Sequence, residues 1–97
     1  MLQGYSILFE FMEFLGKKWV VPLLFFLLIC EQTTFSRIKK QLKITSRALS
    51  KKLKLLEALG LVEKIVIGNP KRAAYKLSEK GKEISQMLLG FATNFSK

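Results

Sequence analysis

The spacing of apolar and polar residues divides most of the chain into helical stretches. Apolar side chains recur every three or four positions, which is the period of an amphipathic helix. On this basis we expect helices over residues 3–15, 17–30, 35–42, 46–59 and 79–95. The second stretch is apolar on nearly every side, which indicates a helix at the centre of the core. Its uncharged run from Trp19 to Cys30 is well short of the roughly 20 residues that a membrane span requires.

The residues between these stretches mark where each helix begins and ends. Gly16 and Gly60 stand where glycine commonly follows a last helical turn. Thr45 and Ser78 stand where a hydroxyl can cap the next helix. The last three expected helices each carry an apolar stripe that should face the core or another chain. The stripes are Phe35, Ile38 and Leu42 in 35–42; Leu49, Leu53, Leu56 and Leu59 in 46–59; and Ile84, Met87, Leu88, Phe91 and Phe95 in 79–95.

A β hairpin is expected between the last two helices. Strand-forming residues cluster over 62–67 and again over 75–77, with Gly68, Asn69 and Pro70 as the turn. Thr33 and Thr34 form a short extended link that either pairs as an edge strand or caps the following helix. The expected order is α-α-(β)-α-α-β-β-α, a mainly α fold with a small β hairpin (α+β). Its 97 residues are enough for one domain, 1–97.

Positive charge is concentrated in the middle of the chain. Residues 37–82 hold fourteen of the 17 Lys and Arg but only three of the seven acids, so the remainder is almost neutral although the whole chain is +10. Concentrated like charge destabilises a compact fold by repulsion. A polyanionic partner offsets that cost, and nucleic acid is the first candidate, with an anionic membrane surface second.

Several chemistries are excluded by composition. The chain has no His, no Asp and a single Cys. This leaves no His/Cys zinc site, no Ser-His-Asp triad and no internal disulfide. We therefore expect no metal, no cofactor and no enzymatic activity. We also expect a cytoplasmic protein that is associated with the nucleoid. Cys30 is expected to be a buried, inert thiol, and a redox switch is the alternative.

Residues 35–59 form the first motif that carries function. Two short helices joined by a tight turn make a helix–turn–helix, whose second helix can enter a major groove. Arg47 can pair with guanine, whereas Lys51 and Lys54 suit phosphates. The alternative to DNA binding is that these lysines form the ordinary solvent-exposed face of a surface helix. Glu57 either pairs with Lys54 or is a solvated acid.

The hairpin tip is the second motif, because a basic ribbon can reach a phosphate backbone or a minor groove. By itself such a tip is more often an ordinary polar turn, but its place directly after a basic helix favours nucleic acid. The candidate DNA-binding residues of the helix pair and the tip are Ser36, Lys39, Lys40, Lys43, Thr45, Ser46, Arg47, Ser50, Lys51, Lys54, Asn69, Lys71 and Arg72.

Four stretches of the sequence resemble elements of a known family. The opening GKKW at 16–19 resembles its G-x-K-W element, and FSRI at 35–38 its F-x-x-[LI] element. LKLLEALGLV at 53–62 and YKLSEKG at 75–81 resemble its L-x-x-L-E-x-x-G-L-[VI] and Y-x-L-T-x-x-G pieces, with Ser78 in place of Thr. Over about 16–90 the chain thus resembles the HxlR-type winged helix–turn–helix regulators of the MarR-like superfamily. Some members sense oxidants through an N-terminal cysteine, whereas residues 1–15 here contain none.

The terminal helices, 1–16 and 83–97, carry more apolar surface than a small core can cover. The resemblance implies homodimers built from these helices, and a monomer that packs them on each other is the alternative. The expected interface consists of Ile7, Leu8, Phe11, Phe14, Leu88, Phe91 and Phe95.

The sequence therefore favours a homodimeric, sequence-specific regulator of transcription that binds double-stranded DNA. Two alternatives remain open. The same fold and charge suit an architectural DNA-binding protein without sequence choice, and Lys outnumbers Arg in this chain, which mildly favours it. A winged-helix module that binds acidic protein is the other.

Overall fold

The computed structural model describes residues 2–96, and the side chains of residues 4–96. The order of elements confirms the expected mainly α fold with a small sheet. The elements are α1 (Leu2–Gly16), α2 (Val20–Cys30), β1 (Gln32–Thr34), α3 (Phe35–Leu42), α4 (Ser46–Ala58), β2 (Val62–Ile67), β3 (Arg72–Leu77) and α5 (Glu79–Phe95).

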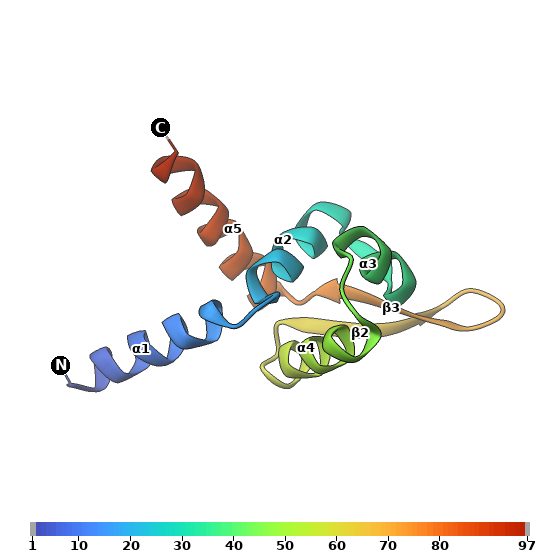
Figure 1. Ribbon diagram of the computed structural model, residues 1–97, viewed down its shortest axis with the longest axis horizontal. Helices are drawn as coiled ribbons and strands as arrows, with labels where there is room; N and C mark the ends of the chain where they lie inside the picture. The colour runs from blue at the N-terminus through green and yellow to red at the C-terminus, as the bar shows by residue number, and fades with distance from the viewer. Residues whose placement is uncertain (1, 97) are drawn as a thin grey trace.

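A three-stranded antiparallel sheet with the order β1-β3-β2 supports the helices. Strands β2 and β3 form the expected hairpin, with Val62 opposite Leu77 and Ile67 opposite Arg72. Thr34 has both of the roles considered for it. It pairs with Ala74 of β3, and its hydroxyl accepts a hydrogen bond of 3.3 Å from the backbone N–H of Arg37, which caps α3. The hairpin extends from the helices as a thin wing (Figure 1).

Helix α2 is central to the core, as its apolar sequence predicts. Val20, Leu23, Leu24 and Leu27 are buried. They form one cluster with the buried residues of the other elements: Ile38, Ile44, Leu49, Leu53, Leu56, Leu61, Val62, Tyr75 and Leu77. Leu59 does not belong to this stripe, contrary to expectation. It follows the last helical residue of α4 as its C-cap and is 42% exposed.

The reversal between α1 and α2 differs from the sequence-based expectation. Gly16 is the last residue of α1, and the left-handed conformation occurs instead at Trp19, with φ 77°. Helix α2 consequently starts at Val20, three residues later than expected. The half-buried Trp19 ring packs against the core, and the Lys18 ammonium lies 5.7 Å from the ring centre. These contacts stabilise a backbone conformation that non-glycine residues seldom adopt.

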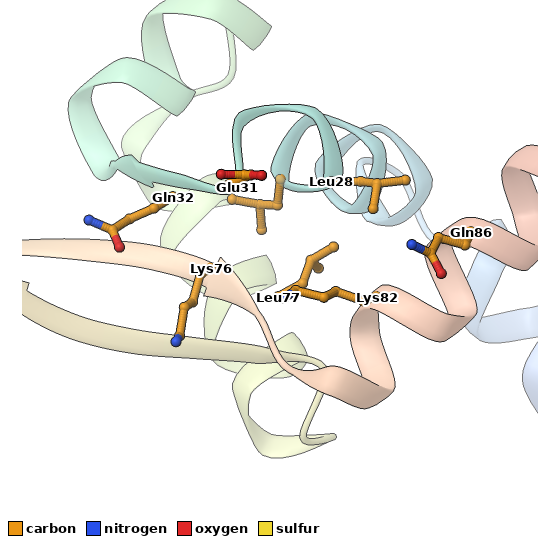
Figure 2. A pocket seen from close by; sticks show the side chains of 8 residues that line it. Leu28, Glu31, Gln32, Lys76, Leu77, Lys82 and Gln86 are labelled. Carbon is orange, nitrogen blue, oxygen red and sulfur yellow. The ribbon is translucent and has the colours of Figure 1, made fainter.

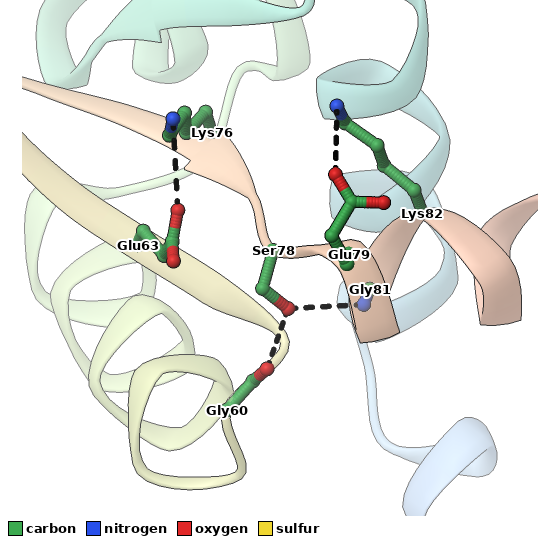
Figure 3. Close-up of polar contacts among 7 residues, drawn as sticks. All are labelled: Gly60, Glu63, Lys76, Ser78, Glu79, Gly81 and Lys82. Atoms are coloured by element: carbon green, nitrogen blue, oxygen red, sulfur yellow. Dashed lines mark hydrogen bonds and ion pairs between the residues drawn. The ribbon is translucent and has the colours of Figure 1, made fainter.

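The end of α4 is fastened to the start of α5. Gly60 takes φ 73°, which only glycine adopts without strain, and directs Leu61 into the core. The Ser78 hydroxyl donates to the Gly60 carbonyl at 2.5 Å and accepts from the Gly81 N–H at 3.0 Å, so it caps α5 as expected (Figure 3). The Ser78 N–H donates to the Leu61 carbonyl at 2.9 Å. We call this set of contacts the α4–α5 clasp.

Beyond the core, α1 and the distal half of α5 extend away in different directions. Figure 1 shows the two helices diverging on the side opposite the wing. The molecule is accordingly elongated, with principal extents of 51 × 31 × 25 Å. The structure therefore does not have the arrangement in which one chain packs its terminal helices on each other along their length.

Candidate nucleic-acid interface

The turn between α3 and α4 is held by backbone geometry and one buried side chain. Lys43 ends α3 in the left-handed conformation with φ 54°, and its N–H donates to the Lys39 carbonyl. Ile44 is buried and anchors the turn. The Thr45 hydroxyl accepts from the Ala48 N–H at 3.2 Å and caps α4, as its position in the sequence predicts. The Lys43 side chain is thereby exposed next to the start of α4.

One face of α4 is outward because the opposite face is in the core. Leu49, Leu53 and Leu56 are buried, so a period of 3.6 residues leaves the other side of the helix in solvent. The candidates on α4 that are exposed are Ser46, Arg47, Lys51 and Lys54. Ser50 is only half-buried and lies at the margin of this face.

A hollow of about 600 Å³ lies where α3 meets the start of α4. Five candidate residues line it together with Phe35 and Ile44: Ser36, Lys39, Lys40, Lys43 and Ser46. Three ammonium groups and two hydroxyls in one concavity match the donors that commonly contact DNA phosphates. The structure thus brings together residues from two helices that the sequence could only assign separately. We call this hollow the α3–α4 pocket.

The tip of the wing consists of residues 68–71, the turn between β2 and β3. Asn69 and Lys71 are exposed in this turn. Arg72 is not on the tip, contrary to expectation, because it is the first residue of β3 and pairs with Ile67. It remains exposed and lies next to the tip. Arg37, an exposed cation in the first turn of α3, was not among the candidates, and only its place in the basic segment could have indicated it.

The positive charge of this surface is not neutralised within the chain. In the part of the chain with described side chains, ion pairs join Lys76 to Glu63 at 3.7 Å and Lys82 to Glu79 at 3.8 Å, and none involves a candidate residue (Figure 3). The considered pair of Glu57 with Lys54 is likewise not formed among these residues. Glu57 instead acts on Tyr75, whose pKa is raised by burial first and by the Glu57 charge second.

No group of three or more His, Cys, Asp or Glu side chains within the described residues could hold a metal ion. None of the helices within residues 2–96 combines the length and the apolar character needed to cross a bilayer.

The fold and the basic pair of helices α3 and α4 are consistent with the protein family whose model matches this chain. The model of the HxlR-like helix-turn-helix family matches residues 14–95. The chain belongs to the HxlR-like helix-turn-helix family. The resemblance noted in the sequence is therefore confirmed, and the match extends over the end of α1, α2, the sheet, α3, α4 and all of α5.

Individual relatives of this HxlR-like chain are bacterial and archaeal. YvaP of Bacillus subtilis (strain 168), an uncharacterized HTH-type transcriptional regulator, is 40% identical over 78 residues, which cover 78% of this chain and 71% of YvaP. The structure of a transcriptional regulator homologue from Pyrococcus horikoshii OT3 superposes with a TM-score of 0.77 at 26% identity, covering 91% of each chain. The reduced form of the regulator YodB from B. subtilis superposes with a TM-score of 0.75 at 27% identity, covering 87% of this chain and 83% of YodB.

These similarities establish the winged helix–turn–helix architecture and the general role. The HxlR-like chain is a transcriptional regulator with a helix–turn–helix fold. Its family consists of regulators and not of enzymes.

Proposed function

We propose that this HxlR-like chain is a homodimer that binds double-stranded DNA with sequence preference. The observation that carries the proposal is the continuous cationic surface of α3 and α4, in which the α3–α4 pocket adjoins the outward face of α4. An α-helix fits the width of a major groove. Arg47 on the exposed face of α4 reads bases, while the residues of the α3–α4 pocket hold phosphates. Lys71 at the wing tip contacts the neighbouring backbone.

The apolar surface of the terminal helices supports the dimer. Ile7 and Phe11 on α1 are 67% and 38% exposed, and Phe91 and Phe95 on α5 are 67% and 90% exposed. Leu8 is exposed as well, whereas Phe14 and Leu88 are half-buried against the chain's own core. Soluble monomers rarely expose apolar area on this scale. A second copy related by a two-fold axis would cover it and would present two α4 helices to successive turns of one DNA site.

The decisive measurement is the base preference of the Arg47→Ala variant. Arg pairs with guanine through two hydrogen bonds, so we expect the preferred site to lose about 1–3 kcal/mol of binding free energy and the preference at one position per half-site to relax. Selection from a random DNA pool followed by titration at one fixed salt concentration measures both. Lys17→Ala, which removes one exposed charge at the α1–α2 junction, is the matched control and should keep the preference.

The wing gives a contrasting prediction. Lys71→Ala should weaken binding to every sequence about equally and lower the slope of log K against log salt by about 1, because it removes one phosphate contact. Titrations of the selected site and of random DNA at several salt concentrations test this. A change in base preference in this variant would contradict the assignment of Lys71 to the backbone. Equal affinity of the unmodified chain for all sequences would instead favour the architectural alternative.

A further inference from the structure

The lysines of the α3–α4 pocket have no acidic residue beside them in its lining. Seven residues line the pocket, of which three are Lys and none is Asp or Glu. A cavity of about 470 Å³ where the sheet meets α2 and α5 differs, because Glu31 lines it together with Lys76 and Lys82 (Figure 2). Lys76 and Lys82 also form the two ion pairs with glutamates. The α3–α4 pocket therefore holds positive charge that no acidic side chain among the described residues pairs with.

Helix geometry keeps the three lysines of the α3–α4 pocket close to one another. Lys43 directly follows α3, and it comes four residues after Lys39 and three after Lys40. Residues at these spacings are neighbours on a helix surface, and like charges at these spacings destabilise the helix. Ser36 precedes Lys39 and Lys40 by three and four residues, so its hydroxyl lies on the same face. An anion bound in the pocket would relieve the repulsion among the lysines.

The first turn of α4 adds partial positive charge to the α3–α4 pocket. Ser46 is the first residue of α4, and it lines the pocket. A helix dipole places about half a positive charge at the N-terminus of a helix and about half a negative charge at its C-terminus. The C-terminus of α3 favours the lysines, whereas the N-terminus of α4 opposes them to about the same extent. The charge of three ammonium groups consequently remains uncompensated.

A phosphate of duplex DNA neutralises only part of this charge. A backbone phosphate is a diester with a single negative charge, and a sugar separates it from the next phosphate. A terminal phosphate carries a charge of about −1.5 to −2 at pH 7 and has three acceptor oxygens. In an oligophosphate, one bridging oxygen joins this group to the next charged phosphate, so several charges enter one hollow together. A free oligophosphate thus matches three ammonium groups more closely than one phosphate of the DNA backbone does.

We propose that the α3–α4 pocket binds a free oligophosphate and that the bound ligand competes with DNA. The ammonium groups of Lys39, Lys40 and Lys43 donate hydrogen bonds to its phosphate oxygens. The hydroxyls of Ser36 and Ser46 supply two further donors. Inorganic chains and nucleotides share this chemistry, and the experiment separates them. The competition rests on the proposed function, because that function assigns the same lysines to the phosphates of DNA.

Binding is tested first without DNA, with inorganic triphosphate as the probe. Cyclic trimetaphosphate is the control ligand, because it has three phosphates but no terminal one. Amide signals of the ¹⁵N-labelled full chain are followed by NMR, without divalent cations and at an ionic strength held constant with chloride. We expect saturable shifts in residues 35–47 with triphosphate and at least about tenfold weaker binding of trimetaphosphate.

Variants of single lysines locate the site. Lys39→Gln and Lys43→Gln should each weaken triphosphate binding about three- to tenfold. Lys64→Gln, which removes an exposed charge of β2 outside the α3–α4 pocket, should leave it unchanged. Three results would overturn the proposed site: absence of saturable shifts, equal affinity for trimetaphosphate, or equal weakening by Lys64→Gln and Lys43→Gln.

ATP distinguishes the two sources of the ligand, because it attaches a nucleoside to the same phosphate chain. Tighter binding of ATP than of triphosphate, with additional shifts at Phe35 of the pocket lining, supports the site and identifies nucleotides as its ligands. Equal or weaker binding of ATP supports the site and identifies the inorganic chain.

The second test measures DNA affinity with and without triphosphate at one ionic strength. Competition for one site multiplies the apparent dissociation constant for DNA by 1 + [L]/Kd, so triphosphate at ten times its own Kd should raise it by at least about tenfold. An unchanged DNA affinity would overturn the competition. Complete absence of DNA binding would refute the proposed function, while the NMR titration would still decide whether the pocket binds triphosphate.

Discussion

Tyr75 shows how one side chain can report on the packing of the wing against α4. The residue lies in β3 between β1 and β2 and is buried. Its pKa is raised above the ordinary value of 10.0, first because burial disfavours the phenolate and second because the Glu57 carboxylate is nearby. A raised pKa of an acid in the folded state means that its contribution to stability is complete below pH 10 and is lost as the pH rises toward the folded-state pKa.

An absorbance titration of the Tyr5→Phe variant measures this pKa directly, because the chain contains two tyrosines and this change leaves Tyr75 alone. We expect a midpoint above 10 in the folded protein. Adding Glu57→Gln should lower the midpoint but leave it above 10, since burial is the larger cause. A midpoint that Glu57→Gln does not move would show that the carboxylate does not act on Tyr75. The same variant in urea supplies the unfolded reference.

The backbone conformation of some individual residues could not be predicted from the sequence. Trp19, Glu31 and Lys43 take positive φ although none is glycine. Trp19 is stabilised in this conformation by core contacts that form only after folding. Propensity rules assign such positions to glycine. Gly16 does end α1, but the left-handed residue is Trp19, so α2 starts at Val20 and not at Lys17. Gly60 and the caps Thr45 and Ser78 were predicted correctly because their role is local.

At the scale of elements, the spacing of the apolar residues was sufficient to predict most of the helices. Leu49, Leu53 and Leu56 defined α4 and its buried face, and the positions of Thr45 and Gly60 bounded it. The sequence did not reveal how α5 meets α4. Gly81 is buried in the first turn of α5, and a Cβ at this position would collide with the Leu61 carbonyl. Its role depends on a close approach between segments twenty residues apart, which no local pattern encodes.

Gly81→Ala and Gly90→Ala make a matched pair on the same helix. Alanine has a higher helix propensity than glycine, by about 1 kcal/mol. Gly90 has open space around the added Cβ, so its variant should be more stable by up to that amount. At Gly81 the collision should outweigh the gain and destabilise the protein by about 1–3 kcal/mol. Urea unfolding measures both changes. Equal stabilisation of the two variants would show that α5 does not need the close approach to Leu61.

At the scale of the whole molecule, the winged core and the terminal helices divide the surface by chemistry. Most of the cations lie on α3, α4 and the wing, whereas the exposed apolar side chains are concentrated on α1 and α5. Composition predicted this division, because the charged segment and the Phe-rich ends are separate in the sequence. It could not predict the α3–α4 pocket, since this depends on how two helices and the turn between them pack.

The proposed dimer is tested by the mass of the protein in solution. Sedimentation should give twice the chain mass of 11.1 kDa. Phe91→Ser should raise the dimer dissociation constant about 10- to 100-fold, because a buried aromatic at an interface commonly contributes about 1.4–3 kcal/mol. Val66→Ser is the control, since Val66 is 63% exposed on β2 and lies outside the terminal helices. A monomeric unmodified chain, or equal effects of the two variants, would contradict an interface made by α5.

The α4–α5 clasp has a consequence for how the two ends of the molecule are oriented. Ser78 and Gly81 fix the rotational phase of α5 at its first turn, directly against the end of α4. Because each residue advances a helix by about 100°, one residue inserted between Ser85 and Leu88 would swing the Phe91 stripe a quarter-turn or more about the helix axis. The first turn of α5, which the α4–α5 clasp holds, would keep its orientation. The number of residues between the α4–α5 clasp and Phe91 thus determines the direction in which the apolar stripe of α5 faces relative to the basic surface of α3 and α4.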